Sequence, residues 1–257
     1  MIEVPTEVLG LTADVLWQFA AVFLRIGALV SVMPGFGERM VPVRVKIGLA
    51  LAFALIVAPA APSFQAPDSL GSFARFAGTE TVIGLALGMG LRLFVLALQT
   101  AGTIAANATS LAQILGGAAA DPLPAMSFIL VLGGLALAVI FGLHVRAAEL
   151  MLLSFDIFPP GRFPDGQILS SWGLAQVRRA FALAFTLAAP FVIASLIYNL
   201  ALGAINRAMP QLMVAFVGAP VITFGGLAIL MVAAPAMLSV WVAALNDFAA
   251  DPMAAVP

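Results

Sequence analysis

The sequence has no cysteine and only one histidine and one lysine, and charged residues make up 9% of its 257 positions. Without cysteine there is no disulfide framework, thiolate metal site or cysteine nucleophile. The single histidine, His144, excludes a site built from several histidines, so we expect no metal and no cofactor. A nucleic-acid surface needs clustered Lys and Arg. Here the eleven basic residues are scattered and the net charge is −1, so we expect no nucleic-acid partner.

Catalytic motifs are also missing. The segment from His144 to Glu149 lacks the HExxH spacing that places two metal ligands on one helix face. No Gly-x-Ser-x-Gly elbow accompanies the histidine, and no GxxxxGK[ST] loop is present to hold phosphates. We therefore predict that the chain is not an enzyme. An intramembrane enzyme that depends on His144 or Glu149 is a weaker alternative.

Apolar surface is what the sequence has in excess. Hydrophobic residues make up 63% of the chain, and the mean hydropathy is +1.14. A soluble domain is roughly half apolar and about a quarter charged, so the excess must face lipid or other protein subunits. We predict an all-α, polytopic membrane-complex protein. Its six apolar blocks lie at residues 15–33, 47–61, 81–115, 125–153, 180–203 and 212–246.

The lengths of these blocks predict broken helices or hairpins. A bilayer core takes about 20 apolar residues as helix, and the first, fourth and fifth blocks meet that length. The second block is short, while the third and sixth are too long for one simple span. Their candidate breaks are Gly102, Gly116 and Gly117 in the third block, and Pro220, Gly225, Gly226 and Pro235 in the sixth.

Small residues inside the blocks are interpreted as helix-packing sites rather than ligand sites. Gly84 and Gly88 form a small-xxx-small step, and such residues let helix backbones approach closely in a membrane. We find no long linker, low-complexity tract or internal repeat. Residues 1–257 are therefore predicted to form a single helical domain.

The basic residues give no membrane orientation. With six spans, the two sets of connections carry equal numbers of Lys and Arg. One set holds Arg39, Arg44, Lys46 and Arg207, and the other holds Arg75, Arg162, Arg178 and Arg179. The positive-inside rule expects a clear asymmetry. Either the spans differ from this count, or the helices do not sit in the bilayer conventionally.

Charged residues inside the apolar blocks are candidates for buried or inter-subunit contacts, because a charge at mid-bilayer normally faces a partner or a water-filled path. For Arg25, and for Arg146 with Glu149, we favour buried polar contacts within an assembly. Arg146 and Glu149 are three residues apart, so they share a helix face and can satisfy each other. For Arg92, an internal ion pair or snorkelling remains an equal alternative.

The Gly/Ala-rich passage at residues 107–124 is too polar for lipid and too apolar for a solvated loop. Irregular backbone at membrane depth is tolerated only inside protein or beside a cavity. A buried loop that lines or closes a conduit fits this composition, and a plain interhelical turn is the alternative. The candidate residues of this loop are Asn107, Ser110, Gln113, Gly116, Gly117, Asp121 and Pro122.

Three sets of motifs, in order along the chain, resemble the FliR family of flagellar biosynthetic proteins and their injectisome counterparts. The first runs from Arg25 through Pro34-Gly-Phe-Gly37 to Val41-Pro42-Val-Arg44. The second is Asp121-Pro122, Gly142-Leu-His144, Ser154-Phe155 and Pro159-x-Gly161. The third is Gly203, Arg207, Pro210-Gln211, Gly218 and Pro220. Each motif alone is weak, but their order across nearly the whole chain is specific.

The resemblance implies a subunit of a type III secretion export gate, which leans flagellar because the opening motif matches best. Such subunits have helices in bent hairpins and assemble with FliP-like and FliQ-like subunits beside an FlhB-like neighbour. They form a channel for unfolded export substrates in the bacterial inner membrane, raised toward the periplasm at the basal body. The channel-closing loop would map onto residues 107–124, and Arg25, Arg207 and Gln211 would make inter-helix or inter-subunit contacts. A small-molecule permease is the main alternative.

Overall fold

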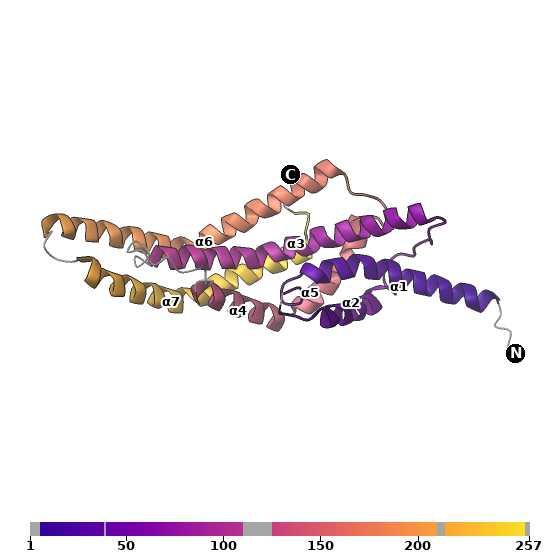
Figure 1. Ribbon diagram of the computed structural model, residues 1–257, viewed down its shortest axis with the longest axis horizontal. Coiled ribbons are helices and arrows are strands. Elements are labelled where there is room, and N and C mark those ends of the chain that lie inside the picture. Colours follow the sequence, from indigo (N-terminus) through magenta and orange to yellow (C-terminus); the bar gives the residue numbers. More distant parts are fainter. Residues whose placement is uncertain (1–5, 39, 110–124, 210–213, 255–257) are drawn as a thin grey trace. The chain divides into compact units, whose positions relative to one another are not determined.

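The computed structural model describes residues 6–38, 40–109, 125–209 and 214–254, with side chains from residue 14 onward and none at 214–220. All regular secondary structure in this part of the chain is helical. Figure 1 follows the helices in chain order, from indigo to yellow. They are α1 (Thr6–Val32), α2 (Val43–Val57), α3 (Leu70–Thr109), α4 (Ala125–Ile140), α5 (Leu143–Ile157), α6 (Gly166–Ala208) and α7 (Val214–Ala250). The predicted all-α class is confirmed.

Several of these helices are long and apolar enough to cross a bilayer. By length and composition, the described residues contain four candidate spans: Asp14–Val32 in α1, the whole of α3, the whole of α6, and Val221–Ala250 in α7. The pair α4 and α5, bent by 73°, passes the same test together and is either a broken fifth span or a re-entrant loop. The predicted polytopic membrane protein is therefore confirmed, and the six apolar blocks correspond to seven helices among the described residues.

The positions of the breaks differ from the prediction. Helix α3 continues through Gly102, and α7 continues through Pro220, Gly225, Gly226 and Pro235, so the expected breaks there were wrong. Gly116 and Gly117 lie outside the described residues. A helix in apolar surroundings can continue through Gly and Pro, because no water competes for its backbone groups and neighbouring helices satisfy the groups that are freed.

The observed break divides the fourth apolar block at Gly142. This residue is the N-cap of α5 and has a φ of 83° in the left-handed region. Glycine adopts that conformation without steric cost, whereas an L side chain does so rarely. Gly142 is thus the residue that lets the chain turn by 73° between α4 and α5.

The chain divides into two compact units. The first unit comprises Met1–Arg92, Gly142–Gln176 and Asn246–Pro257, and the second comprises Leu93–Phe141 and Val177–Leu245. The division falls within α3, α6 and α7 and at the α4–α5 bend. The prediction of a single domain stays a prediction.

In the first unit, α1 packs beside α2 and also meets α3 at the small-xxx-small step. A Cβ on Gly84 would collide with the carbonyl of Arg25 and lie 2.9 Å from the Cβ of Ala28. A Cβ on Gly88 would lie 2.7 Å from the carbonyl oxygen of Leu29. These glycines let the two helices touch backbone to backbone, which confirms their interpretation as packing sites.

Gln18 of α1 holds the chain where it leaves α2. Its side-chain amide donates to the carbonyl oxygens of Pro62 at 2.8 Å and Ala58 at 3.3 Å. Its side-chain oxygen accepts from the backbone N–H of Phe64 at 3.1 Å. One side chain therefore satisfies backbone groups that the end of a helix leaves without intrahelical partners.

In the second unit, α3 packs against α4 and α7 through close contacts and single hydrogen bonds. Gly102 lies against the backbone of Ser127, whose hydroxyl donates to the carbonyl oxygen of Gln99 at 3.1 Å. The fully buried Trp241 donates its indole N–H to the carbonyl oxygen of Phe94 at 2.7 Å. The role of Gly102 is thus close packing of helices rather than chain breaking.

Candidate functional site

Arg25 and Glu80 form a fully buried ion pair at the centre of the first unit. The Arg25 Nε lies 2.7 Å from Glu80 Oε2, and both residues are 0% exposed. The sequence led us to expect a buried polar contact for Arg25, and this is the contact that the structure gives within the chain. A buried charge is tolerated only when it is paired and its hydrogen-bonding groups are satisfied.

The remaining donors of Arg25 cap the C-terminal end of α5. Its Nη1 donates to the carbonyl oxygen of Ser154 at 2.7 Å, and its Nη2 donates to that of Phe158 at 3.0 Å. The guanidinium also lies 4.1 Å from the centre of the Phe155 ring. The carbonyl oxygen of Ser154 also accepts from the backbone N–H of Phe158 at 3.0 Å. The C-terminal end of a helix carries its negative dipole end, so a buried cation is well placed there.

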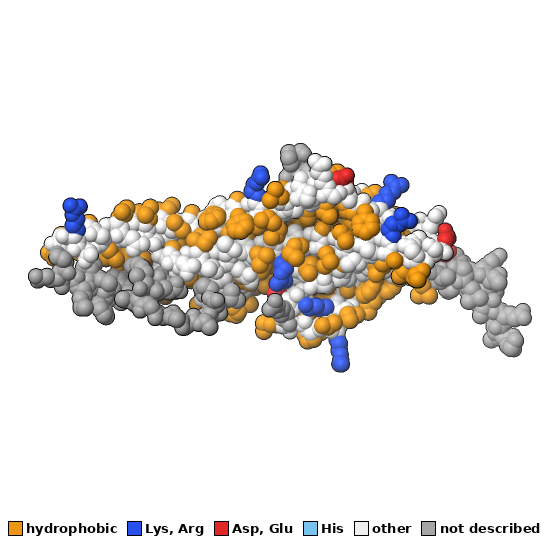
Figure 2. Space-filling model, turned by 45° about the horizontal axis from the view of Figure 1, so that its top comes forward, with side chains coloured by type: hydrophobic (Ala, Val, Ile, Leu, Met, Phe, Trp, Pro, Cys, Tyr) orange, Lys and Arg blue, Asp and Glu red, His pale blue; other side chains and the backbone are white. Residues whose placement is uncertain are grey.

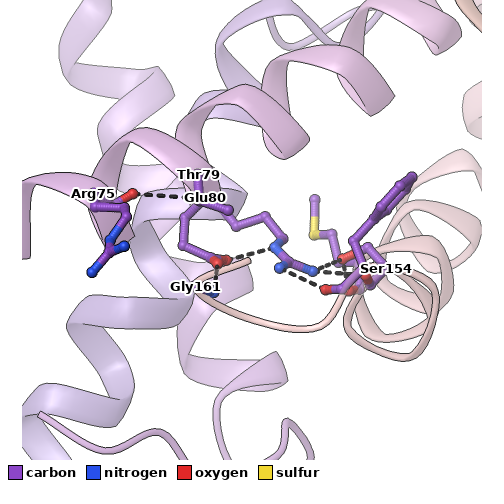
Figure 3. A network of polar contacts seen from close by, with 8 residues as sticks. Arg75, Thr79, Glu80, Ser154 and Gly161 are labelled. Atoms are coloured by element: carbon purple, nitrogen blue, oxygen red, sulfur yellow. Dashed lines mark hydrogen bonds and ion pairs between the residues drawn. The ribbon is translucent and has the colours of Figure 1, made fainter. Parts of the chain in front are cut away.

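The second carboxylate oxygen of Glu80 holds the turn between α5 and α6. Glu80 Oε1 accepts from the backbone N–H of Gly161 at 2.9 Å. Figure 3 shows Glu80 beside Gly161, with Ser154 further along the same series of contacts. Residues of α1, α3, α5 and the following turn therefore meet in one network. Because Arg25 and Glu80 are sealed from solvent, the network can fix helices in place but offers no access to a substrate.

The other predicted charged residues form weaker and more exposed pairs. Arg92 Nη1 lies 3.5 Å from Glu38 Oε1, with both side chains about one quarter exposed, 26% and 29%. Arg146 Nη1 donates to Glu149 Oε2 at 2.9 Å, with the side chains 48% and 55% exposed. Arg146 and Glu149 satisfy each other as the spacing predicted, but within this chain their pair lies at the surface.

The remaining candidates are not brought together. Arg207 is exposed in the last turn of α6, and Asn107 is exposed near the end of α3. Gln211, and the loop residues Ser110, Gln113, Gly116, Gly117, Asp121 and Pro122, lie outside the described residues. Among the residues that the structure does describe, no group of three His, Asp or Glu could hold a metal ion.

The sequence reasoning missed Glu80, the residue that completes the network. A signal was available, because Glu80 is the only acidic residue between Asp68 and Asp121 and stands at the edge of a long apolar block. An isolated acid there and an isolated arginine at mid-helix in the first block are natural partners. Trp241 was also missed, since nothing in the sequence distinguishes a tryptophan that binds a backbone carbonyl from one that faces lipid.

Comparison with known proteins decides the family. The family described as bacterial export proteins, family 1, matches residues 16–248. The chain belongs to this family, the FliR family. The flagellar biosynthetic protein FliR of Caulobacter vibrioides is 34% identical over 234 residues, which cover 90% of this chain and 93% of that protein. The FliR proteins of Escherichia coli and Bacillus subtilis are 32% and 30% identical, each over at least 80% of both chains.

Membership confirms the resemblance that the sequence motifs indicated. The chain is a FliR-family membrane component of the flagellar export apparatus, and it is not an enzyme. The structure shows that residues of the first two motifs are in contact. Arg25 of the first motif meets Ser154, Phe155 and, through Glu80, Gly161 of the second motif. Residues of two motifs far apart in the sequence thus belong to one buried network.

Proposed function

We propose that this FliR-family chain is a structural, pore-forming subunit of the flagellar type III export gate. It assembles with FliP-like and FliQ-like subunits beside an FlhB-like neighbour, around a channel for unfolded export substrates. Its place is the bacterial inner membrane at the basal body, raised toward the periplasm. Residues 107–124 close the channel until the export machinery opens it, and the energy for opening comes from partners or the membrane potential.

The observation that carries this proposal is how the chain distributes its charged and apolar side chains. Arg25 and Glu80, the fully buried charged residues of the described chain, bind each other and nearby backbone. Large apolar side chains are instead exposed along α6 and α7, including Phe181, Phe185, Leu196, Phe224 and Met231. Figure 2 shows hydrophobic side chains spread over the visible face among scattered charges. Such a surface needs lipid or other subunits to cover it.

The same observation disfavours a small-molecule permease. Permeases place substrate and coupling ions at a midplane site, usually between inverted repeats and with free half-helix ends. Here the carbonyls at the end of α5 are already occupied by Arg25. The carboxylate of Glu80 is likewise occupied on both oxygens. These buried groups are therefore engaged with each other within the chain rather than presented to a transported solute.

Contacts at both ends of residues 107–124 support the closing-loop part of the proposal. At the entry, Thr109 lies against Gly226 of α7, where an added Cβ would be 2.5 Å from Thr109 Cγ2. At the exit, Ser127 lies against Gly102 and donates to Gln99 of α3. Both flanks are thus fixed to helices of the second unit, as a loop that must return to one closed position requires.

Co-purification tests the proposal. A tagged chain is expressed with FliP-like and FliQ-like partners, extracted in mild detergent and weighed intact by native mass spectrometry. We expect a stable hetero-oligomer that contains one copy of this chain, and removal of residues 110–122 should leave the particle intact while making reconstituted vesicles leak. A monodisperse monomer or homodimer that ignores both partners would contradict the export-gate function and favour the permease.

A further inference from the structure

Helix α2 is too short to cross a bilayer alone and carries an apolar outer face. Its 15 residues make a helix of about 22 Å at 1.5 Å per residue, against a hydrocarbon core of about 30 Å. Val43, Ile47, Leu51 and Leu55 recur every four residues and are all exposed, between 38% and 69%. One face of α2 is therefore apolar along its whole length.

The positive charge of α2 is confined to one end. Arg44 and Lys46 lie in its first turn, and the helix contains no acidic residue. The nearest acid before the helix, Glu38, is paired with Arg92. The ammonium group of Lys46 donates one hydrogen bond to the carbonyl oxygen of Gly37 at 2.8 Å. Its two other N–H groups remain available as donors. Arg44 is exposed, and the described residues give it no ion pair. Among the side chains that the structure describes, these two cations therefore have no carboxylate partner.

A groove between α1 and α2 begins at the same end. It has a volume of about 490 Å³ and reaches Thr81 of α3, a size in the range of ligand pockets, which run to roughly 300–1,000 Å³. Its walls are mostly apolar, with Lys46 as the charged residue. The lining residues from α1 and α2 include Phe23, Gly27, Ala28, Val43, Ile47 and Ala50.

We propose that this groove binds one anionic phospholipid, whose phosphate lies against Lys46 in the groove wall and whose acyl chain lies along Gly27, Ile47 and Ala50. Arg44 does not line the groove, but it adds positive charge at the same end of α2. The two halves of the ligand match two observations. The unpaired cations require an anion, and the apolar groove that continues from them requires a hydrocarbon chain. A soluble anion would leave the groove empty, and a neutral lipid would leave the cations unpaired. This inference stands apart from the proposed pore function.

The test measures lipid retained by the full chain, in its complex or alone, after reconstitution in phosphatidylglycerol or phosphatidylcholine vesicles and extraction for native mass spectrometry. We expect phosphatidylglycerol to be retained selectively. A cation near an anionic bilayer contributes about fivefold in affinity, so the double variant R44Q/K46Q should bind roughly 25-fold more weakly. The single variant R178Q removes an exposed arginine of the second unit and should have no effect.

A second variant addresses the groove without touching the charges. In G27L the added Cβ lies 3.7 Å or more from its nearest neighbours, atoms of Phe23, and the rest of the leucine side chain extends from a residue that lines the groove. Lipid retention should fall in G27L with the particle intact. Equal retention in R44Q/K46Q, in G27L and in the unaltered chain would overturn the proposal. So would equal retention of phosphatidylcholine, or a cross-link from position 47 to a partner subunit in place of lipid.

Discussion

The two units of this FliR-family protein are stabilised by different kinds of interaction. The first unit is organised around a buried ion pair, Arg25 with Glu80, that also satisfies backbone groups of three segments. In the second unit the described residues form no ion pair. Its sequence contains a single acidic residue, Asp121. Glycine contacts occur in both units. In the second unit they are joined by the hydroxyl of Ser127, the indole of Trp241 and the guanidinium of Arg179, which donates to the carbonyl oxygen of Ala244 at 3.4 Å.

The difference shows two ways of specifying helix contacts where apolar burial provides little discrimination. A charged group in a dry interior has very few acceptable positions, because a misplaced partner leaves it unpaired. Close glycine contacts are selective in another way, since they require particular residues to face each other without a Cβ between them. We therefore expect the first unit to be destabilised most by removing one charge of the buried pair. We expect the second unit to be destabilised most by adding volume at a glycine that contacts another helix.

Breaking the buried pair should have the largest effect. Glu80→Ala leaves the Arg25 cation unpaired and the Gly161 N–H without its acceptor, and loss of one partner of a buried pair costs about 3–5 kcal/mol. For a chain of this size, that lowers the midpoint of thermal unfolding by on the order of 10 °C. The change can be followed in detergent by intrinsic fluorescence.

The double variant R25M/E80L is the control for this first prediction. It removes both charges and should recover part of the loss, because no unpaired ion remains. Recovery should be incomplete, since the carbonyls of Ser154 and Phe158 lose the donors of Arg25, and only that of Ser154 keeps a second donor, the backbone N–H of Phe158. A double variant no more stable than Glu80→Ala would show that the pair is not the stabilising element.

Added volume at Gly102 should have a smaller but clear effect. In Gly102→Ala the new methyl group collides with the backbone of Ser127, and overpacking of this kind costs about 1–3 kcal/mol. Gly225→Ala is the matched control in the same unit, because nothing lies within 4 Å of the added methyl group there. It should be neutral or slightly stabilising by about 0.4–1 kcal/mol. Equal unfolding midpoints for the two variants would contradict the close-contact interpretation.

The smallest effect is expected at the surface pair. Arg146→Gln removes an ion pair whose side chains are about half exposed, and such pairs contribute roughly 0–1 kcal/mol. Its unfolding midpoint should therefore stay close to that of the unaltered chain when the chain is purified alone. If the predicted inter-subunit role is right, the same variant should reduce recovery of the hetero-oligomer. Unchanged recovery would limit Arg146 to its local contact with Glu149.

Composition and block lengths were sufficient to predict the helical membrane fold, but they did not locate its breaks. Gly102 and Gly142 are both glycines in long apolar blocks, and only Gly142 has a positive φ. What separates them is the neighbour across the interface: Gly102 faces the backbone of Ser127, whereas nothing lies within 4 Å of a Cβ on Gly142. Such a contact joins residues 25 positions apart and leaves no local signature in the sequence.

The sequence singled out one member of the buried network, Arg25, but not its partners. The cost of a mid-helix charge identified Arg25, because that argument needs only the residue and its block. Its acceptors could not be inferred in the same way. Two of them are backbone carbonyls, of Ser154 and Phe158, and backbone groups are identical at every position of a sequence. Those carbonyls reach Arg25 because α5 ends at Ile157 and the chain leaves the helix in an extended conformation at Phe158.

The buried network also has a consequence for how the protein is made. Arg25 lies 55 residues before Glu80 and 129 and 133 residues before Ser154 and Phe158. Because chains emerge N-terminus first at about 5–20 residues per second, roughly 3–10 seconds pass before Glu80 follows Arg25 out of the ribosome. During that interval Arg25 has left the ribosome and its counter-ion has not. We therefore expect the network to form in chain order, with the Arg25 charge neutralised only after α3 is made and the contacts to α5 formed last.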